Sequence, residues 1–247
     1  MALSNKKVTA GVILIGDELL SGRTQDTNLK TIADFLSPLG VQIGEARIIA
    51  DKAELIIDAV REFSKRFDYV FTTGGIGPTH DDITADCVAK AFNVGISERD
   101  DALAELRLRY NDEELNEVRR RMARIPTGAL LIKNPVTQAP GFQTKNVFTM
   151  AGVPSIMKGM LADIAPRIQG GQEIFSRTVH ANGFGEGDAA AYLASIEAAY
   201  DSLTIGSYPY FTEKGRGVNF VARGIDEVDL DAAEIQLKKL VERLSKS

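Results

Sequence analysis

The 247-residue sequence contains few of the residues that build disulfides and metal sites. It has one cysteine, Cys87, two histidines, His80 and His180, and no tryptophan. A single cysteine can form neither a disulfide nor a cysteine-based zinc site within one chain. Two histidines are too few for a histidine-rich metal site. These absences exclude the common zinc modules and favour a protein of a reducing compartment.

Excess positive charge and long apolar runs are also missing. The net charge is -5 at pH 7, which argues against nucleic-acid binding through bulk charge. No apolar run approaches the ~18 residues that a membrane helix requires. The opening stretch, MALSNKKVTAGVILIG, lacks the apolar length and the small-residue cleavage site of a signal peptide. We therefore expect a cytoplasmic protein with no nucleic-acid and no membrane partner.

The apolar residues that are present alternate between two periodicities along the first 92 residues. Continuous apolar runs are typical of strands buried on both faces, and stripes at a spacing of three or four residues are typical of helices. The predicted strands are 8–15, 41–49 and 69–73, and the predicted helices are 28–39, 51–67 and 82–92. Such alternation predicts an α/β fold, in which helices cover both faces of a mostly parallel sheet.

The middle of the chain is more charged. Residues 98–124 have helical periodicity, which predicts two helices meeting near Asn111. Within them, the run Arg119-Arg120-Arg121 is interpreted as a helix surface facing solvent or another subunit. The elements predicted after this segment are strands at 130–132 and 147–150 and a helix from Pro154 to about Gln169.

A glycine pair, Gly170-Gly171, predicts a boundary between two domains, 1–170 and 171–247. The pattern after it predicts a small α+β module of strand 175–180, helix 188–200, strands 203–208 and 217–223, and helix 230–244. A core of about 75 residues is marginal by itself, so we expect the module to depend on the larger domain.

The stretch FTTGGIGPTHDDITAD, residues 71–86, follows the third predicted strand. Ligands of open parallel sheets bind beyond the carboxyl ends of the strands. Glycines at 74, 75 and 77 let backbone N–H groups approach phosphate or carboxylate oxygens, and the next helix adds a favourable field for an anion. The spacing matches neither a Walker P-loop nor G-x-G-x-x-G. A tight turn is the alternative interpretation.

Two acids, Asp81 and Asp82, follow this loop directly. Carboxylates repel a bound anion unless a cation lies between them, and Mg²⁺ prefers carboxylates together with phosphate oxygens. The pair therefore indicates a metal-bridged phosphate. The alternative is structural, because Thr79-x-x-Asp82 also has the spacing of a capping box.

Acids also follow the first two predicted strands. Asp17 and Glu18 come after the first, and Asp51 comes after the second. Asp51 has its own structural alternative, since it is spaced as a helix N-cap with Glu54 three residues later. If all of these acids reach one edge of the sheet, Asp82 is the first candidate for a metal ligand and Asp51 the second.

Four motifs together carry a family resemblance: IGDELLSGRTQDTN, TTGGIGPTHDDITAD, NPVTQAPGF and AGVPSIMKGM. Over about residues 8–168, the sequence resembles the MoaB/Mog-type molybdopterin-binding superfamily and, within it, the N-terminal domain of the CinA family. A related domain begins the eukaryotic FAD synthases. Residues 173–247 are similar to the small middle domain of CinA-type proteins. The C-terminal amidohydrolase domain of full-length CinA has no counterpart here, so deamidation of nicotinamide mononucleotide is not expected.

The resemblance implies a three-layer α/β/α fold, a pocket for a pterin or a nucleotide, and a homo-oligomer (dimer or trimer). CinA-type domains resemble pyrophosphatases that act on ADP-ribose or FAD-like dinucleotides with Mg²⁺ or a transition ion. By position, the implied catalytic residues are Asp51, Asp82 and Asp17, with Asp82 and Asp51 as metal ligands. The implied substrate-binding residues are Thr73, Gly74, Gly75, Gly77, Asp81 and Glu18.

The sequence departs from the CinA pattern at Ala151 and Ile156, which stand where many members have a proline and an acid. Loss of that acid would weaken or alter catalysis. Three hypotheses follow: a metal-dependent hydrolase of nucleotide diphosphates, a non-catalytic protein that binds a pterin or nucleotide, and a molybdopterin adenylyltransferase. The PTHDD continuation of the glycine loop is of the CinA type, which disfavours the third.

Overall fold

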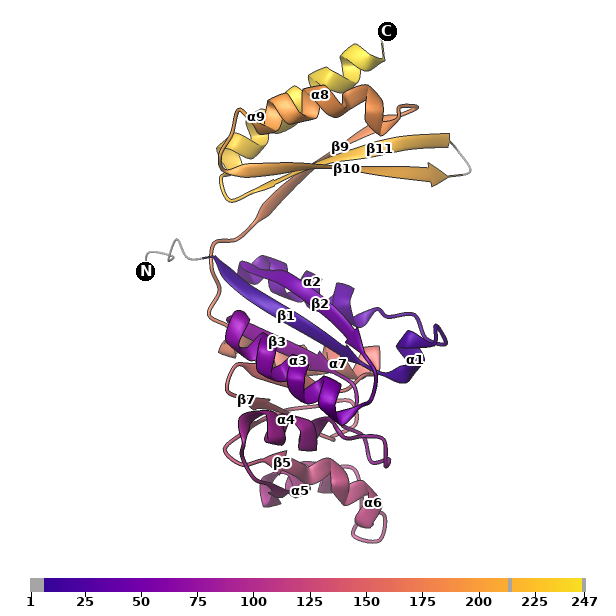
Figure 1. Cartoon of the computed structure of the whole chain (residues 1–247), viewed down its shortest axis with the longest axis vertical. Helices are drawn as coiled ribbons and strands as arrows, with labels where there is room; N and C mark the ends of the chain where they lie inside the picture. Colours follow the sequence, from indigo (N-terminus) through magenta and orange to yellow (C-terminus); the bar gives the residue numbers. More distant parts are fainter. Residues whose placement is uncertain (1–6, 213–214, 246–247) are drawn as a thin grey trace. The chain divides into compact units, whose positions relative to one another are not determined.

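The computed structural model describes residues 7–212 and 215–245, and the chain forms two compact units, Met1–Gln172 and Glu173–Ser247 (Figure 1). The division falls two residues after the predicted Gly170-Gly171 boundary. Each unit has a hydrophobic core of its own.

The first unit is organised by a six-stranded sheet in the order β2-β1-β3-β8-β7-β6. Strands β2, β1, β3 and β8 are parallel, whereas β7 and β6 continue the sheet in antiparallel pairing. The bounds are β1 Val8–Ile15, β2 Val41–Ile49, β3 Tyr69–Thr73, β6 Leu130–Ile132, β7 Gly141–Thr144 and β8 Val147–Met150. Because the carboxyl ends of the parallel strands meet at one edge, the loops that follow them are brought together there.

Helices cover both faces of this sheet, as the alternating pattern predicted (Figure 1). On one face, α3 and α4 pack through Ile56, Phe63 and Val88; on the other, α2 and α7 pack through Ile32 and Met160. The bounds are α2 Asn28–Leu36, α3 Ala53–Arg66, α4 Thr84–Phe92 and α7 Pro154–Ile164. The unit is therefore a three-layer α/β/α domain with a mostly parallel sheet.

The segment between α4 and β6 differs from the two helices predicted for residues 98–124. It contains a two-stranded antiparallel pair and short helical turns: β4 Ile96–Glu98, α5 Asp100–Arg107, α6 Glu117–Arg120, a 3-10 turn Arg121–Ala123 and β5 Arg124–Pro126. Strands of three residues are too short to show a period of two in the sequence, which explains why they were missed. A single turn of helix, α1 Asp17–Leu20, was missed for the same reason.

The second unit has the predicted order of strand, helix, two strands and helix. Its antiparallel sheet has the order β10-β11-β9, and α8 and α9 lie on one of its faces (Figure 1). Val179, Phe220 and Leu237 are among the residues of its core. The bounds are β9 Phe175–Asn182, α8 Glu186–Glu197, β10 Leu203–Thr212, β11 Gly215–Gly224 and α9 Glu227–Leu244.

None of the helices within residues 7–212 and 215–245 combines the length and the apolar character needed to cross a membrane.

Candidate functional site

A cavity of about 610 Å³ lies where the parallel strands end. Its wall includes residues from the loops after all four of these strands, such as Glu18 after β1, Asp51 after β2, Gly77 after β3 and Gly152 after β8. This volume is within the ~300–1,000 Å³ typical of small-molecule pockets. The sheet topology therefore gathers the loops singled out in the sequence around one ligand-sized space.

The glycine loop after β3 has a backbone path that only glycine can follow. Gly74 has a φ of 105°, and a Cβ there would lie 2.1 Å from the carbonyl oxygen of Ile15. Gly75 has a φ of 68°, and a Cβ there would lie 2.2 Å from Oγ1 of Thr84. Such contacts, added to the strain of a left-handed conformation, exclude larger residues. The loop is thus a tight turn, and its backbone is not covered by side chains of its own glycines.

The amides of this loop are not equivalent. The Gly74 N–H donates to the carbonyl oxygen of Met150 at 3.1 Å, so it is not available for a ligand, in contrast to the expectation for all three glycines. The Gly75 and Gly77 amides have no protein acceptor among the described residues, and both glycines line the cavity. Gly74 therefore shapes the loop, while Gly75 and Gly77 retain free donors.

Asp51 lines the cavity and faces other acids. Its Oδ2 accepts the N–H of Asp17 at 3.0 Å, and the N-cap of α3 is Lys52, so Asp51 anchors the loop after β1 rather than capping its own helix. Burial raises the pKa of Asp51, and the neighbouring charges of Asp17, Glu18 and Asp81 raise the pKa further. A cation beside this carboxylate would counter both effects.

Asp82 closes the glycine loop. Its Oδ2 accepts the backbone N–H of Thr79 at 2.8 Å and also the Thr79 hydroxyl proton. The bonding resembles the predicted capping box, but α4 begins at Thr84 with Ile83 as its N-cap, so it holds a turn rather than the helix end. The same carboxylate lines the cavity. The structural and the ligand-binding interpretations are therefore compatible.

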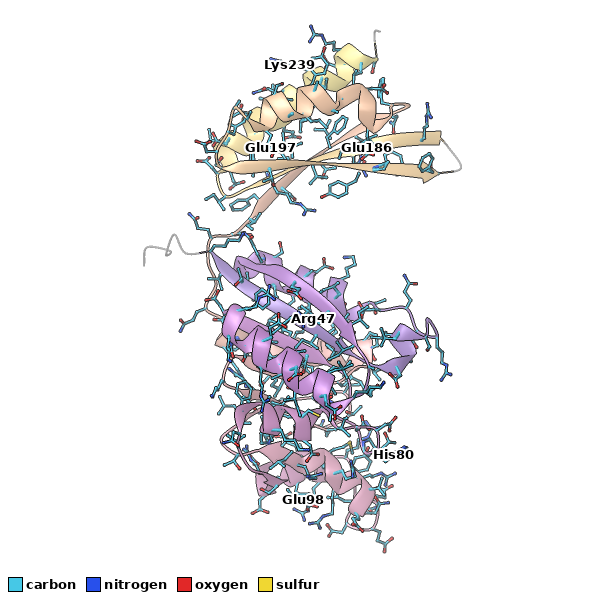
Figure 2. The ribbon with its side chains drawn as sticks, in the orientation of Figure 1. Arg47, His80, Glu98, Glu186, Glu197 and Lys239 are labelled. Carbon is cyan, nitrogen blue, oxygen red and sulfur yellow. The ribbon has the colours of Figure 1, made fainter. Side chains whose placement is uncertain are left out.

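Most of the predicted site residues line this cavity: Glu18, Asp51, Gly74, Gly75, Gly77, Asp81 and Asp82. Two predicted residues contribute differently. Asp17 supplies a backbone amide to Asp51 and its side chain is exposed beyond the cavity wall. Thr73 is buried beneath the loop, where its Oγ1 accepts from Asn28 at 3.4 Å. Neither residue is among those that line the cavity, and their expected catalytic and substrate-binding roles stay predictions. His80 is almost fully exposed beside the site (Figure 2).

Several residues of the wall were not predicted. The guanidinium of Arg119 lies 4.7 Å from the ring centre of Tyr110, and both side chains line the cavity. Asn134 accepts the Val136 and Thr137 amides and donates to the Ala139 carbonyl, which fixes the loop of the NPVTQAPG motif. The motif carries part of the family resemblance, and its asparagine was the signal in the sequence that could have indicated this loop.

The donor set suits a metal ion that is shared with a ligand. Among the residues that the structure describes, no group of three or more His, Cys, Asp or Glu side chains is arranged to hold an ion alone. Mg²⁺ is commonly held by one or two carboxylates together with phosphate oxygens and water. Asp51 and Asp82 at one cavity wall fit that pattern, whereas a structural metal centre held by the protein alone does not fit.

An α/β/α sandwich with a cavity at the carboxyl edge of its parallel strands defines a small-molecule-binding domain. Residues 11–170 match the family described as "Probable molybdopterin binding domain", and residues 173–245 match "FAD synthase, middle domain". The chain belongs to the molybdopterin-binding-domain family and, within it, to the CinA-like proteins, which confirms the resemblance read from its motifs.

Individual relatives support this assignment. A CinA-like protein of Citrifermentans bemidjiense is 38% identical over 187 residues, covering 72% of this chain and 45% of the relative. A protein of Archaeoglobus fulgidus is 34% identical over 199 residues, covering 80% and 84%. The crystal structure of CinA from Thermoplasma acidophilum, described as of unknown function, is 34% identical with a TM-score of 0.60, covering 64% of this chain and 98% of that one. The chain spans about half the length of the CinA-like relatives.

Proposed function

We propose that this chain binds a nucleotide diphosphate, such as ADP-ribose or an FAD-like dinucleotide, and hydrolyses its pyrophosphate linkage with a divalent metal ion. The observation that carries the proposal is the composition of the cavity wall. Carboxylates of Asp51 and Asp82 line the same 610 Å³ space as the free amides of Gly75 and Gly77. Carboxylates next to anion-binding amides suit a phosphate whose charge is bridged by a cation.

In this proposal each residue has a defined part. Asp51 and Asp82 would hold the ion, which, when bound, would neutralise phosphate charge and activate water. Gly75 and Gly77 would donate to phosphoryl oxygens. Glu18 lines the cavity and interacts electrostatically with Asp51, so it is our candidate to accept the proton of the attacking water. Water would add to one phosphorus and the bridging P–O bond would break, which gives two monophosphates.

Binding without catalysis is the second candidate function, and Ile156 favours it. The side chain lines the cavity where many CinA-type sequences have an acid, so this chain offers one carboxylate fewer at the wall. The molybdopterin-binding family supports a pterin or a nucleotide as the ligand in that case. Molybdopterin adenylylation is the third candidate, and pyrophosphate release from ATP that depends on added molybdopterin would identify it.

Removal of the Asp82 charge tests the proposal. Asp82→Asn keeps an oxygen that can accept the Thr79 N–H but loses the negative charge needed for a metal ion. We expect the variant to lose metal-dependent cleavage of ADP-ribose or FAD by about 100-fold or more, because metal activation is worth several kcal/mol. Chromatography of the nucleotide products, with several divalent ions tested in parallel, measures the effect.

The matched control is Asp112→Asn, the same change at a side chain that is 92% exposed. It should leave turnover unchanged, and circular dichroism should show that both variants fold. Wild-type turnover by Asp82→Asn would contradict the site. Calorimetry separates the second candidate: tight binding of the dinucleotide by wild-type protein, with no product after hours of incubation, would establish a binder and exclude the hydrolase.

A further inference from the structure

A second, much smaller cavity is also lined by residues of the glycine loop. Its volume is about 20 Å³. The residues that line both cavities are Gly75, Ile76, Gly77, Asp82 and Met122. A space of this size holds about one water molecule or one ligand oxygen. The small cavity is therefore too small for a whole ligand and has room for one atom of a ligand in the larger cavity.

Arg121 lines this small cavity and, unlike Arg120 and Arg124, has no counter-ion among the described residues. Its Nε is buried without a hydrogen-bond partner, and no ion pair or hydrogen bond of its guanidinium occurs within the described part of the chain. Arginine stays charged at any ordinary pH. A buried donor on a charged group that lacks an acceptor is costly, so the position favours an oxygen that would satisfy it.

Two nearby arginines are already paired with carboxylates. Arg120 forms an ion pair with Glu98 at 2.6 Å, and Glu98 is the last residue of β4. Arg124 lines the small cavity but forms two hydrogen bonds with Asp86, at 2.7 and 3.1 Å. That pair balances its own charge. Of the two arginines that line the small cavity, Arg121 is the one whose charge is not balanced by a carboxylate, so it can interact with an anionic ligand.

Further unpaired donors lie on the glycine loop, which lines the same small cavity as Arg121. The Gly75 and Gly77 amides have no acceptor among the described residues. Two acids also line the small cavity: Asp86, which pairs with Arg124, and Asp82, which accepts from Thr79. The small cavity is thus bordered by the Arg121 guanidinium and by two backbone amides that have no acceptor among the described residues.

We infer that Arg121, together with the Gly75 and Gly77 amides, forms a subsite for one phosphoryl oxygen of a ligand whose remainder occupies the larger cavity. A tetrahedral phosphoryl group can place one oxygen in the 20 Å³ space while its other oxygens stay beside Asp51 and Asp82. The ligand class is a pyrophosphate ester. The inference rests on the proposed function for the identity of the bound diphosphate, but not on its hydrolysis. Arg121 is then a binding residue that positions the phosphoryl group.

Binding of inorganic pyrophosphate to the full chain tests the subsite. Titration calorimetry would compare wild-type protein with Arg121→Gln and Arg121→Lys, with and without Mg²⁺. Hydrogen bonds to charged groups contribute about 1.5–3 kcal/mol, so we expect Arg121→Gln to raise the Kd for pyrophosphate by about 10- to 100-fold. Arg121→Lys keeps the charge without the planar donors and should be intermediate.

The control is Arg120→Gln, the same substitution at the neighbouring arginine that pairs with Glu98. Its Kd should stay within about twofold of wild type. Equal Kd values for wild type and Arg121→Gln would show that the cavity holds only a water, and would overturn the inference. Absence of pyrophosphate binding by wild type would overturn it too.

The design also separates the subsite from the proposed hydrolase. Weakened pyrophosphate binding by Arg121→Gln, in a protein that cleaves no dinucleotide, would keep the subsite and reject the hydrolase. If the wild-type protein cleaves a dinucleotide and Arg121→Gln has an unchanged Kd for pyrophosphate, the hydrolase is kept and the subsite is rejected. Far-UV circular dichroism and the melting temperature report folding, and if Arg121→Gln does not fold, Arg121→Lys gives the comparison.

Discussion

Asp51 shows how the surroundings of a single cavity residue affect the stability of the fold. Its carboxylate is partly buried and faces the charges of Asp17, Glu18 and Asp81, and both effects raise its pKa. The hydrogen bond from the Asp17 amide acts in the opposite direction but does not cancel them. A carboxyl group whose pKa is raised by folding binds its proton more tightly in the folded state than in the unfolded state. Its negative charge at neutral pH therefore lowers the free energy of unfolding.

The variant Asp51→Asn should consequently be more stable than wild type at neutral pH. Asparagine keeps an acceptor for the Asp17 amide and has no charge. The stability of wild type should fall as pH rises from about 4 through the raised pKa, so the advantage of the variant should grow over that window and vanish below it. Melting temperatures measured from pH 3.5 to 8 without divalent ions would show this.

A divalent ion gives the complementary test of the same residue. Mg²⁺ with pyrophosphate should raise the melting temperature of wild type and have little effect on Asp51→Asn, because binding to the folded state stabilises it. A variant less stable than wild type by the same amount at every pH would mean that the hydrogen bond of Asp51, rather than its charge, dominates.

At the scale of elements, β1 and β3 were predictable because nearly all of their residues are buried, whereas β2 is an edge strand with partly exposed residues. All three strands begin and end at the predicted residues. Once those strands are known to be parallel, the acids and glycines that follow them must reach one edge, which is why Asp51 and Asp82 could be predicted for the site. The predicted part of the cavity wall follows from sheet topology alone.

The opposite wall could not be predicted in this way. Arg119 and Arg121 belong to the segment between α4 and β6, which was interpreted as a helix surface facing solvent or another subunit. Its path depends on tertiary contacts, namely the packing of Ile125 in the core and the ion pair between Arg124 and Asp86. Neither contact produces a hydrophobic periodicity that could be recognised in the sequence. A run of three arginines gives no sign that two of them line cavities.

The pairing of β3 with β8 gives a prediction at this scale. Phe71 and Phe148 stack at 5.2 Å between ring centres, and both are fully buried. Phe148→Ala would leave a cavity in the core and should lower the free energy of unfolding of the first unit by about 3–5 kcal/mol. It should also weaken ligand binding, because the two strands end at Thr73 and Met150, where the Gly74 amide is bound.

Urea unfolding followed by circular dichroism measures this loss. The control is Phe211→Ala on β10, where the ring is 81% exposed and the change should be within about 0.5 kcal/mol. A loss below about 1 kcal/mol for Phe148→Ala would mean that the core relaxes around the missing ring, and that the strand ends do not depend on it.

At the scale of the whole molecule, the site residues belong to the first unit. The residues that line the two cavities fall between Ile15 and Ile156. The segment that leads to the second unit also packs on the first, since a Cβ at Gly170 would lie 1.8 Å from the Leu39 carbonyl oxygen, and one at Gly40 would lie 2.6 Å from the Gly171 carbonyl oxygen. The first unit, including residues 170–172, is thus a complete structural unit around its cavities.

A chain ending at Gln172 should therefore fold and bind pyrophosphate by itself. Its sheet, both layers of helices and both cavities are retained, and the second unit has a separate core. We expect a single cooperative melting transition and a Kd for pyrophosphate within about threefold of the full chain, which corresponds to less than about 1 kcal/mol. The full chain, measured in the same buffer, is the control.

If the truncated protein melts cooperatively yet binds pyrophosphate more than about tenfold more weakly, residues 173–247 contribute to the site, and the assignment of binding to the first unit is wrong. If it binds pyrophosphate within about threefold of the full chain, the residues of the first unit are sufficient for binding.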